Sequence, residues 1–162
     1  MTKKLMTKLE IKNLIRDSLE RKTLQWSAGV VIVQRNIDSE DWKFLALKKS
    51  NGKYDIAKGI VEPGEENLEC AIREAKEESN ISLDAKDFLW GGRSITYGRG
   101  VAYLAATDQN PKVKPNPVTG IMEHKSAAWV SFDEMIANIS DFLKPAIMWA
   151  YRIINGDQSV NI

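Results

Sequence analysis

Apolar residues near the start of the chain recur at helical spacing. Ile11, Leu14, Ile15 and Leu19 lie three or four positions apart, which is the spacing of one face of a helix. We therefore predict an amphipathic helix over about residues 8–22. We expect its apolar face to pack on the body of the protein, and a surface for a partner is the alternative.

Apolar, β-branched and aromatic residues then gather in runs that are typical of strands. Residues 26–35 and 42–49 form a first pair, with a polar hairpin loop between them. Residues 86–97 and 100–107 form a second pair with glycines at the turn, and residues 127–130 form a short strand after a proline-rich loop. These runs predict two strand pairs and one further strand.

Two signals near the C-terminus mark helices. Ser131 and Glu134 have the spacing of a capping box, in which each side chain bonds to the backbone of the other residue. Pro145 suits the first turn of a helix, and the Asn-Gly pair at residues 155–156 suits its end. They predict a helix over the apolar residues 146–154.

The central segment REAKEES, residues 73–79, crowds acidic side chains on one helix. The inward face of that helix is marked by apolar residues at helical spacing: Leu68, Ala71, Ile72 and Ala75. Glu74, Glu77 and Glu78 then lie together on the adjoining stripe. Like charges at this spacing repel by only roughly 0.2–0.5 kcal/mol per pair in water, so a solvated helix face is one explanation for them.

The loop before this helix favours a metal site instead. Gly59, the turn at residues 63–64 and Glu65 form a compact connection from a strand into the acidic helix. A loop and helix joined in this way can direct backbone carbonyls and several carboxylates to one point. Clustered carboxylate and carbonyl oxygens suit hard divalent ions such as Mg²⁺.

Composition excludes several classes of protein. The 162 residues suit one domain, and Lys plus Arg (23) nearly balances Asp plus Glu (22), which argues against a general polyanion-binding surface. The single cysteine, Cys70, excludes an internal disulfide and a cysteine-rich zinc site, and we expect it to be small and half-buried. No segment has the ~18 apolar residues of a membrane span or the apolar core of a signal peptide. We therefore expect a cytoplasmic protein without a membrane partner.

Residues 59–81 resemble the Nudix box, the signature of a hydrolase family. Its pattern is Gly, five residues, Glu, seven residues, then Arg-Glu-aliphatic-x-Glu-Glu-x-Gly-aliphatic. The positions in register with it are Gly59, Glu65, Arg73, Glu74, Glu77, Glu78 and Ile81, with Ala75 in the small aliphatic slot. Asn80 stands where the family usually has glycine, and asparagine is the other residue that best tolerates a left-handed helix end.

The resemblance implies a fold and an activity. The fold would be a Nudix-type α/β/α sandwich with a mixed sheet over residues 26–162, with residues 1–25 as a helical extension outside it. The activity would be hydrolysis of a phosphoanhydride bond in a nucleoside diphosphate linked to another group, X, with Mg²⁺ or Mn²⁺ as the cofactor. A homodimer is compatible with this hypothesis.

The resemblance also implies roles for individual residues. The divalent ions would be held by the carbonyl of Gly59 and by the carboxylates of Glu74, Glu77 and Glu78. Arg73 would pair with Glu65 and fix the loop against the helix. The general base would be Glu74 or Glu123, a glutamate of the loop before the last strand, although Glu123 is equally explained as a solvated loop residue. We expect His124, the sole histidine, to be a surface or packing residue, and a catalytic or phosphate contact is the alternative.

Within the family, residues 48–78 look like the asymmetrical diadenosine tetraphosphate hydrolases, notably in KGIVEPGEENLECAIRE, and the E-H-x₄-W of residues 123–129 recurs there. Those enzymes bind adenine by aromatic stacking and polyphosphate through basic side chains. The candidates for such contacts in this chain are Lys53, Tyr54, Lys58, Tyr97 and Arg99. Each of them is equally explained as an ordinary residue of a strand surface.

Departures from that subfamily keep other activities open. The related enzymes commonly carry Trp and Pro where this chain has Tyr54, Ile56 and Ala57, and their spacing of tyrosine and lysine after the third strand is not reproduced. A capped or triphosphorylated RNA 5′ end, ADP-ribose and a dinucleotide cofactor are therefore alternative substrates. A nucleotide-binding regulatory module without catalysis is the alternative of another class.

Overall fold

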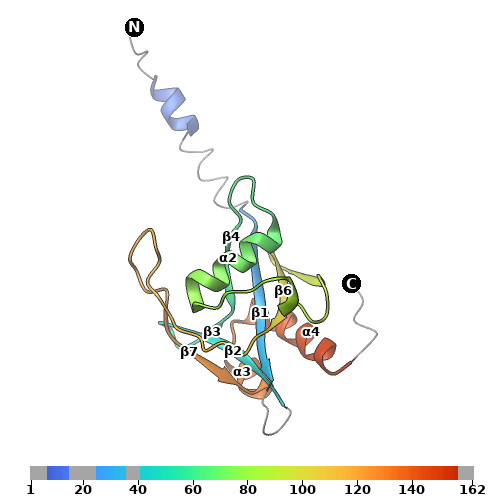
Figure 1. Ribbon diagram of the computed structural model, residues 1–162. Coiled ribbons are helices and arrows are strands. Elements are labelled where there is room, and N and C mark those ends of the chain that lie inside the picture. Colours follow the sequence, from blue (N-terminus) through green and yellow to red (C-terminus); the bar gives the residue numbers. More distant parts are fainter. Residues whose placement is uncertain (1–6, 15–24, 36–40, 157–162) are drawn as a thin grey trace.

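The computed structural model describes residues 7–14, 25–35 and 41–156 (Figure 1). The strands are β1 (Ser27–Arg35), β2 (Trp42–Lys49), β3 (Tyr54–Asp55), β4 (Ala57–Ile60), β5 (Ser94–Tyr97), β6 (Gly100–Ala106) and β7 (His124–Val130). The helices that follow β4 are α2 (Asn67–Ser79), α3 (Phe132–Asn138) and α4 (Lys144–Ile154), with 3₁₀ turns at η1 (Ala85–Asp87) and η2 (Asp141–Leu143).

Strand β1 organises the sheet. Its second half pairs antiparallel with β2, through Val33 and Phe44 for example, and its first half pairs antiparallel with β4, through Ala28 and Gly59. β6 runs parallel to β1 and carries β5, whereas β3 and β7 both pair with β2. β4 thus pairs with the half of β1 that β2 leaves unpaired. Because α2 follows β4 in the chain, α2 begins beside the centre of the sheet.

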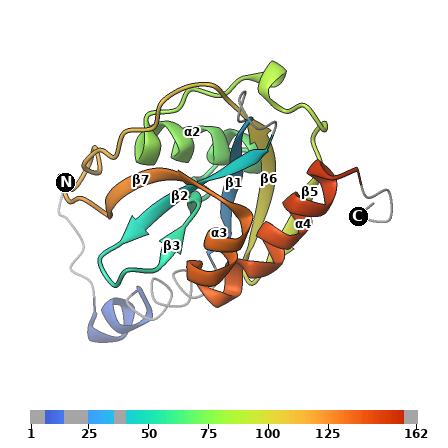
Figure 2. The ribbon, with the colours of Figure 1, turned by 90° about the horizontal axis from the view of Figure 1, so that it is seen from below.

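Helices cover both faces of this mixed sheet (Figure 2). On one face α2 buries Cys70, Ala71 and Ala75 fully among side chains of β1 and β2. On the other face α3 and α4 bury Met135 and Ile147. Removing these apolar side chains from water is the main favourable contribution to folding. The prediction of an α/β/α sandwich with a mixed sheet is confirmed.

The strand predictions hold for the first pair and fail for part of the second. β1 and β2 match the predicted ranges within one residue, and β7 begins three residues earlier than predicted. Residues 86–93, however, were predicted as strand and contain none. Asp84 and Asp87 form a reciprocal cap that starts η1, and Gly91 has a φ of +83°, so local turn chemistry prevails over the apolar run.

The C-terminal helices begin and end close to their predicted signals. Ser131 caps α3 by accepting a hydrogen bond from the backbone N–H of Glu134. The Glu134 carboxylate does not return this bond but accepts from the hydroxyl of Tyr54, so the capping box is half-formed. Helix α4 has Pro145 in its first turn and ends before Gly156, whose φ is +76°.

The predicted N-terminal helix is described over residues 8–14 only, because residues 15–24 lie outside the described part of the chain. Leu9, Ile11 and Leu14 are exposed there by 67%, 45% and 52%. Over these residues the expected packing on the body does not occur. Among the described residues, no helix combines the length and apolar character needed to cross a membrane.

Candidate active site

Helix α2 carries its acidic side chains along the border of the face that it packs on the sheet. The side chains of Glu74, Glu77 and Glu78 are exposed by 13%, 30% and 7%. Anchoring by Ala71 and Ala75, both fully buried, turns this stripe towards β4 rather than into bulk water. A merely solvated charged face is therefore wrong for Glu78.

The inward face of α2 differs in one respect from the prediction. Ala71 and Ala75 are buried as expected, whereas Leu68 and Ile72 are half-buried. Cys70 was expected to be half-buried and is fully buried, and burial raises the pKa of its thiol to about 12. The thiol is therefore a packing group that faces the carbonyl of Gly59 at 3.5 Å.

The end of β4 lies directly against the acidic side chains. A β-carbon added to Gly59 would overlap the carboxyl group of Glu74. A larger residue at this position would therefore require the Glu74 carboxyl group to move, whereas glycine lets it lie against the strand. The first position of the motif thus determines how near the Glu74 carboxylate lies to the backbone.

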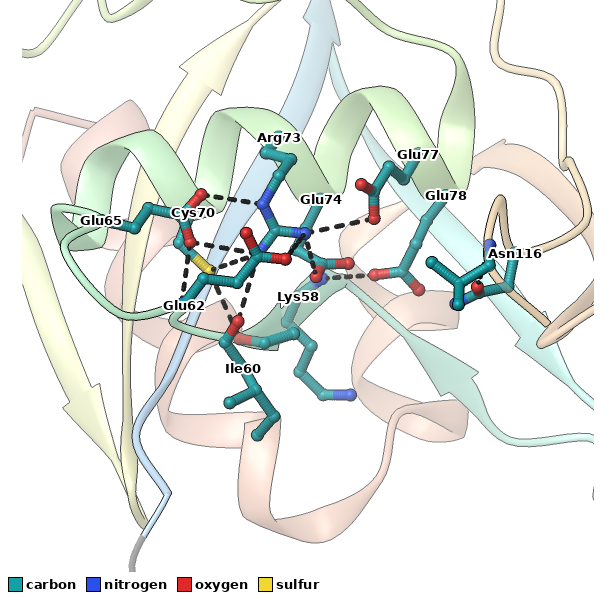
Figure 3. Close-up of polar contacts among 12 residues, drawn as sticks. Lys58, Ile60, Glu62, Glu65, Cys70, Arg73, Glu74, Glu77, Glu78 and Asn116 are labelled. Carbon is teal, nitrogen blue, oxygen red and sulfur yellow. Dashed lines mark hydrogen bonds and ion pairs between the residues drawn. The ribbon is translucent and has the colours of Figure 1, made fainter. Parts of the chain in front are cut away.

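Arg73 ties the loop before α2 to the helix (Figure 3). Its Nε and Nη2 donate to the two carboxylate oxygens of Glu65 at 2.8 and 3.1 Å, and Nη2 also donates to the carbonyl of Ile60 at 3.1 Å. Its Nη1 donates to Glu74 at 2.9 Å and to Glu77 at 3.2 Å. The hydrogen bonds from Arg73 lower the pKa of Glu65 to about 2. The structure thus brings Arg73 and Glu65 together as the resemblance to the Nudix box implied.

A buried chain of polar groups leads away from Glu78. Its Oε1 accepts from the backbone N–H of Lys58 at 2.8 Å, and its Oε2 lies 3.2 Å from Nδ1 of His124. Nε2 of His124 lies 3.0 Å from Oδ2 of Asp55, and the same oxygen accepts from Nζ of Lys58 at 3.1 Å. The chain links helix α2 to strands β7, β3 and β4.

Burial sets the electrostatics of the carboxylates. It raises the pKa of Glu78 to about 9, and the neighbouring charges of Glu74 and Asp55 act in the same direction, although the N–H of Lys58 opposes them. Burial also raises the pKa of Glu74, assisted by the charge of Glu77 and opposed by Arg73. A bound cation would favour the ionised form of both groups.

The carboxylates open into a cleft of about 540 Å³. Glu74 and Glu77 line one side, and residues 116–119 with Glu123 line another. Asn116 donates through Nδ2 to Oε1 of Glu123 at 3.3 Å, and it also accepts from the backbone of residues 118–119. Glu78, Glu123 and His124 offer donor atoms that lie within 4.8 Å of one another. Both ring nitrogens of His124 already face carboxylates, but the oxygens of Glu78 and Glu123, with Glu74 and Glu77 in the same cleft, fit a hard divalent cation.

The candidate substrate residues are scattered. Lys58 lines the cleft, but its Nζ bonds to Asp55. Tyr97 is only 6% exposed and its hydroxyl bonds to Ser27, so the expected stacking face is not available. Lys53, Tyr54 and Arg99 do not line the cleft; the hydroxyl of Tyr54 bonds to Glu134, and the other two are exposed.

Sequence reasoning missed Asp55 and Asn116, and it expected His124 to be a surface or packing residue, with a catalytic or phosphate contact as the alternative. Asp55 and His124 are 69 positions apart and meet because β3 and β7 both pair with β2. The available signal was local: His124 directly follows Glu123, and Asn116 begins a turn seven residues before Glu123. The contact between Asp55 and His124 follows only from the strand pairing.

The fold and the cleft together define a class of protein. A strand with Gly59 next to its end leads through a loop into a helix with three glutamates, on a mixed sheet that is covered on both faces, which is the arrangement of a Nudix hydrolase. The NUDIX domain model matches residues 23–150, so the chain belongs to this family. It is a Nudix pyrophosphohydrolase.

Similar proteins agree with this assignment. The asymmetrical bis(5′-nucleosyl)-tetraphosphatase of Sus scrofa is 31% identical over 120 residues, which cover 67% of this chain and 80% of that protein. An Ap4A hydrolase binary complex from C. elegans has a TM-score of 0.64 at 22% identity and covers 82% of this chain and 98% of its own. The NUDIX domain of Shewanella oneidensis NrtR, complexed with ADP ribose, has a TM-score of 0.58 at 13% identity and covers 93% and 99%. The two solved structures support the fold.

Proposed function

We propose that this enzyme hydrolyses a phosphoanhydride bond of a dinucleoside polyphosphate such as diadenosine tetraphosphate, with Mg²⁺ or Mn²⁺ as the cofactor. The observation that carries the proposal is the cleft that Glu74, Glu77 and Glu123 share beside the buried Glu78. The substrate class is supported by the 31% identity to an asymmetrical tetraphosphatase.

In this proposal the glutamates of α2 hold the divalent cation. Glu74, Glu77 and Glu78 supply carboxylate oxygens, and Gly59 supplies its carbonyl. The bound cation would neutralise charge on the phosphoryl oxygens and lower the pKa of a water molecule. Arg73 keeps the loop of Glu65 against the helix. Its Nη1 donates one hydrogen bond to Glu74 and one to Glu77, and these bonds restrict the rotation of both carboxylates.

A further carboxylate must accept the proton of the attacking water. Glu74 and Glu123 both line the cleft. Glu74 is held by Arg73 at 2.9 Å and is packed against Gly59, whereas Glu123 is exposed and receives only a long bond of 3.3 Å from Asn116. A carboxylate held this loosely can turn towards a water molecule, so we assign Glu123 as the base.

The experiment is a substrate panel with purified protein and either Mg²⁺ or Mn²⁺. We expect faster hydrolysis of diadenosine tetraphosphate than of ADP-ribose, a dinucleotide cofactor or RNA with a capped or triphosphorylated 5′ end. Reaction in ¹⁸O-labelled water, followed by mass analysis, identifies the phosphorus that is attacked. Absence of turnover on every substrate with either ion would overturn the proposal.

Two matched variants of α2 separate catalysis from folding. Glu78→Gln should lower kcat by about 100-fold or more, since it removes a ligand whose cation supplies much of the transition-state stabilisation. Glu69→Gln, at an exposed position of the same helix, should leave kcat within about two-fold. Equal activity of the two variants would argue against a metal at Glu78.

A further inference from the structure

The Asp55–His124 pair has no role in the reaction described above, although it touches the acidic site. The side chains of Asp55, His124 and Glu78 are exposed by only 4%, 4% and 7%. The two ring nitrogens of His124 face different carboxylates, at 3.0 Å for Asp55 and 3.2 Å for Glu78. The imidazole is therefore a rigid bridge between a strand residue and a residue of α2.

Burying such groups is costly unless each one has a partner. Here the partners are present: besides His124, Asp55 faces Lys58 Nζ at 3.1 Å, and Asp55 Oδ1 also accepts from the backbone N–H of Ile56 at 2.9 Å. Glu78 is bound at both oxygens, by the Lys58 backbone and by His124. A fully bonded network of this kind restricts the rotation of every member.

The sheet is shaped to place His124 at this point. Along most of β7 the pairing with β2 is regular, but the register shifts between Lys48 and Lys49, where Lys48 pairs with Ser126 and Lys49 pairs with His124. One residue of β7, Lys125, is thus left over, as in a β-bulge. Bulges re-aim side chains and are frequent beside active sites.

We propose that Asp55 and His124 are positioning residues that act in series: Asp55 orients the imidazole, and the imidazole fixes the Glu78 carboxylate for metal binding. This inference rests on the proposed function, in which Glu78 is a ligand of the cation. Groups that orient metal ligands in this way typically change metal affinity or activity by about 10- to 100-fold when they are removed.

The test is Mn²⁺ affinity, measured by electron paramagnetic resonance on the full chain. His124→Gln should weaken Mn²⁺ binding by about 10-fold or more, and Asp55→Asn, which nearly preserves the side-chain volume, should weaken it several-fold. The double variant should bind no more weakly than His124→Gln, because residues that act in series have non-additive effects. Asp141→Asn, which removes the charge of a surface pair with Lys144, should bind as the wild type does.

The outcomes are distinguishable. A wild-type protein that binds no Mn²⁺ would overturn the proposed function itself. If the wild type binds Mn²⁺ and both single variants bind within two-fold of it, only the positioning role falls, and a lower unfolding temperature with unchanged affinity would show a purely structural pair. Additive losses in the double variant would refute action in series. If His124→Gln does not fold, the Mn²⁺ affinity of Asp55→Asn tests the positioning role by itself.

Discussion

Glu78 combines burial with a close neighbour of the same charge. It is 7% exposed and lies beside Glu74, and for both residues burial raises the pKa. Without a cation the protein keeps Glu78 protonated up to a pH of about 9. A bound divalent ion requires the ionised carboxylate, so the ion and the proton compete for Glu78.

This burial predicts a pH dependence of stability. The unfolded chain releases the Glu78 proton near the ordinary pKa of 4.5, and the folded protein releases it near 9. Between these values the folded state binds more protons, so the free energy of unfolding should fall as the pH rises. With a chelator present, the unfolding temperature should drop between pH 5 and pH 9 by several degrees, at roughly 2–4 °C per kcal/mol.

Two controls isolate that effect. Glu78→Gln should flatten the dependence, since its side chain does not titrate, and Mg²⁺ should raise the unfolding temperature most at the higher pH. The prediction would be contradicted if the unfolding temperatures of the metal-free wild type and of Glu78→Gln had the same pH dependence over this range.

Gly59 offers a second prediction at a single residue. Gly59→Ala places a methyl group on the Glu74 carboxyl, so it should displace that carboxylate and lower kcat by about 10-fold or more, as expected for a misplaced catalytic group. Gly92→Ala is the matched control, because nothing lies within 4 Å of the added carbon. Steady-state kinetics of both variants provide the measurement. Full activity of Gly59→Ala would contradict the prediction, because it would mean that β4 shifts to make room for the methyl group.

At the scale of elements, α2 ends as its sequence suggested. Asn80 has a φ of +60° and donates its N–H to the carbonyl of Lys76. Asparagine thus takes the left-handed position in which the family usually has glycine. The helix stops there, two residues after the last metal-binding candidate, Glu78.

The cap can be tested with a pair of variants. Asn80→Ala should lower the free energy of unfolding by about 1 kcal/mol, since alanine is disfavoured in the left-handed conformation that asparagine tolerates. Asn80→Gly also removes the side chain but fits the conformation, so its stability should be equal to or above that of the wild type. Urea denaturation measures both, and equal losses in the two variants would mean that the side chain itself stabilises the cap.

At the scale of the whole molecule, we propose that residues 1–25 form an extension that the catalytic domain does not need. The family match begins at residue 23, and the described apolar side chains of residues 8–14 are exposed. A chain that begins at Gln25, which keeps this last residue of the extension because it lines the cleft, should keep its unfolding temperature within a few degrees and its kcat within two-fold. A large loss of either would place the extension in the core or the site.

Much of the site was predictable because its residues are close in sequence. From Gly59 to Glu78 the spacing itself specifies a loop, a helix and one face of that helix, so the three glutamates could be brought together in advance. The pairing of Arg73 with Glu65 was implied by the resemblance to the Nudix box, and the structure contains it. The same local rules failed at residues 86–93, where an apolar composition suggested a strand and side-chain caps made turns.

The sequence by itself determined the motif and most of the strands and helices, because periodicity and turn chemistry act over a few residues. The class of the fold followed from the resemblance of that motif to the Nudix box. Only the tertiary structure decided which distant residues meet. Pairing of β3 and β7 with β2 placed Asp55 and His124 behind Glu78, and packing buried Tyr97 away from the cleft. Register and burial depend on the whole sheet, and no short stretch of sequence contains them.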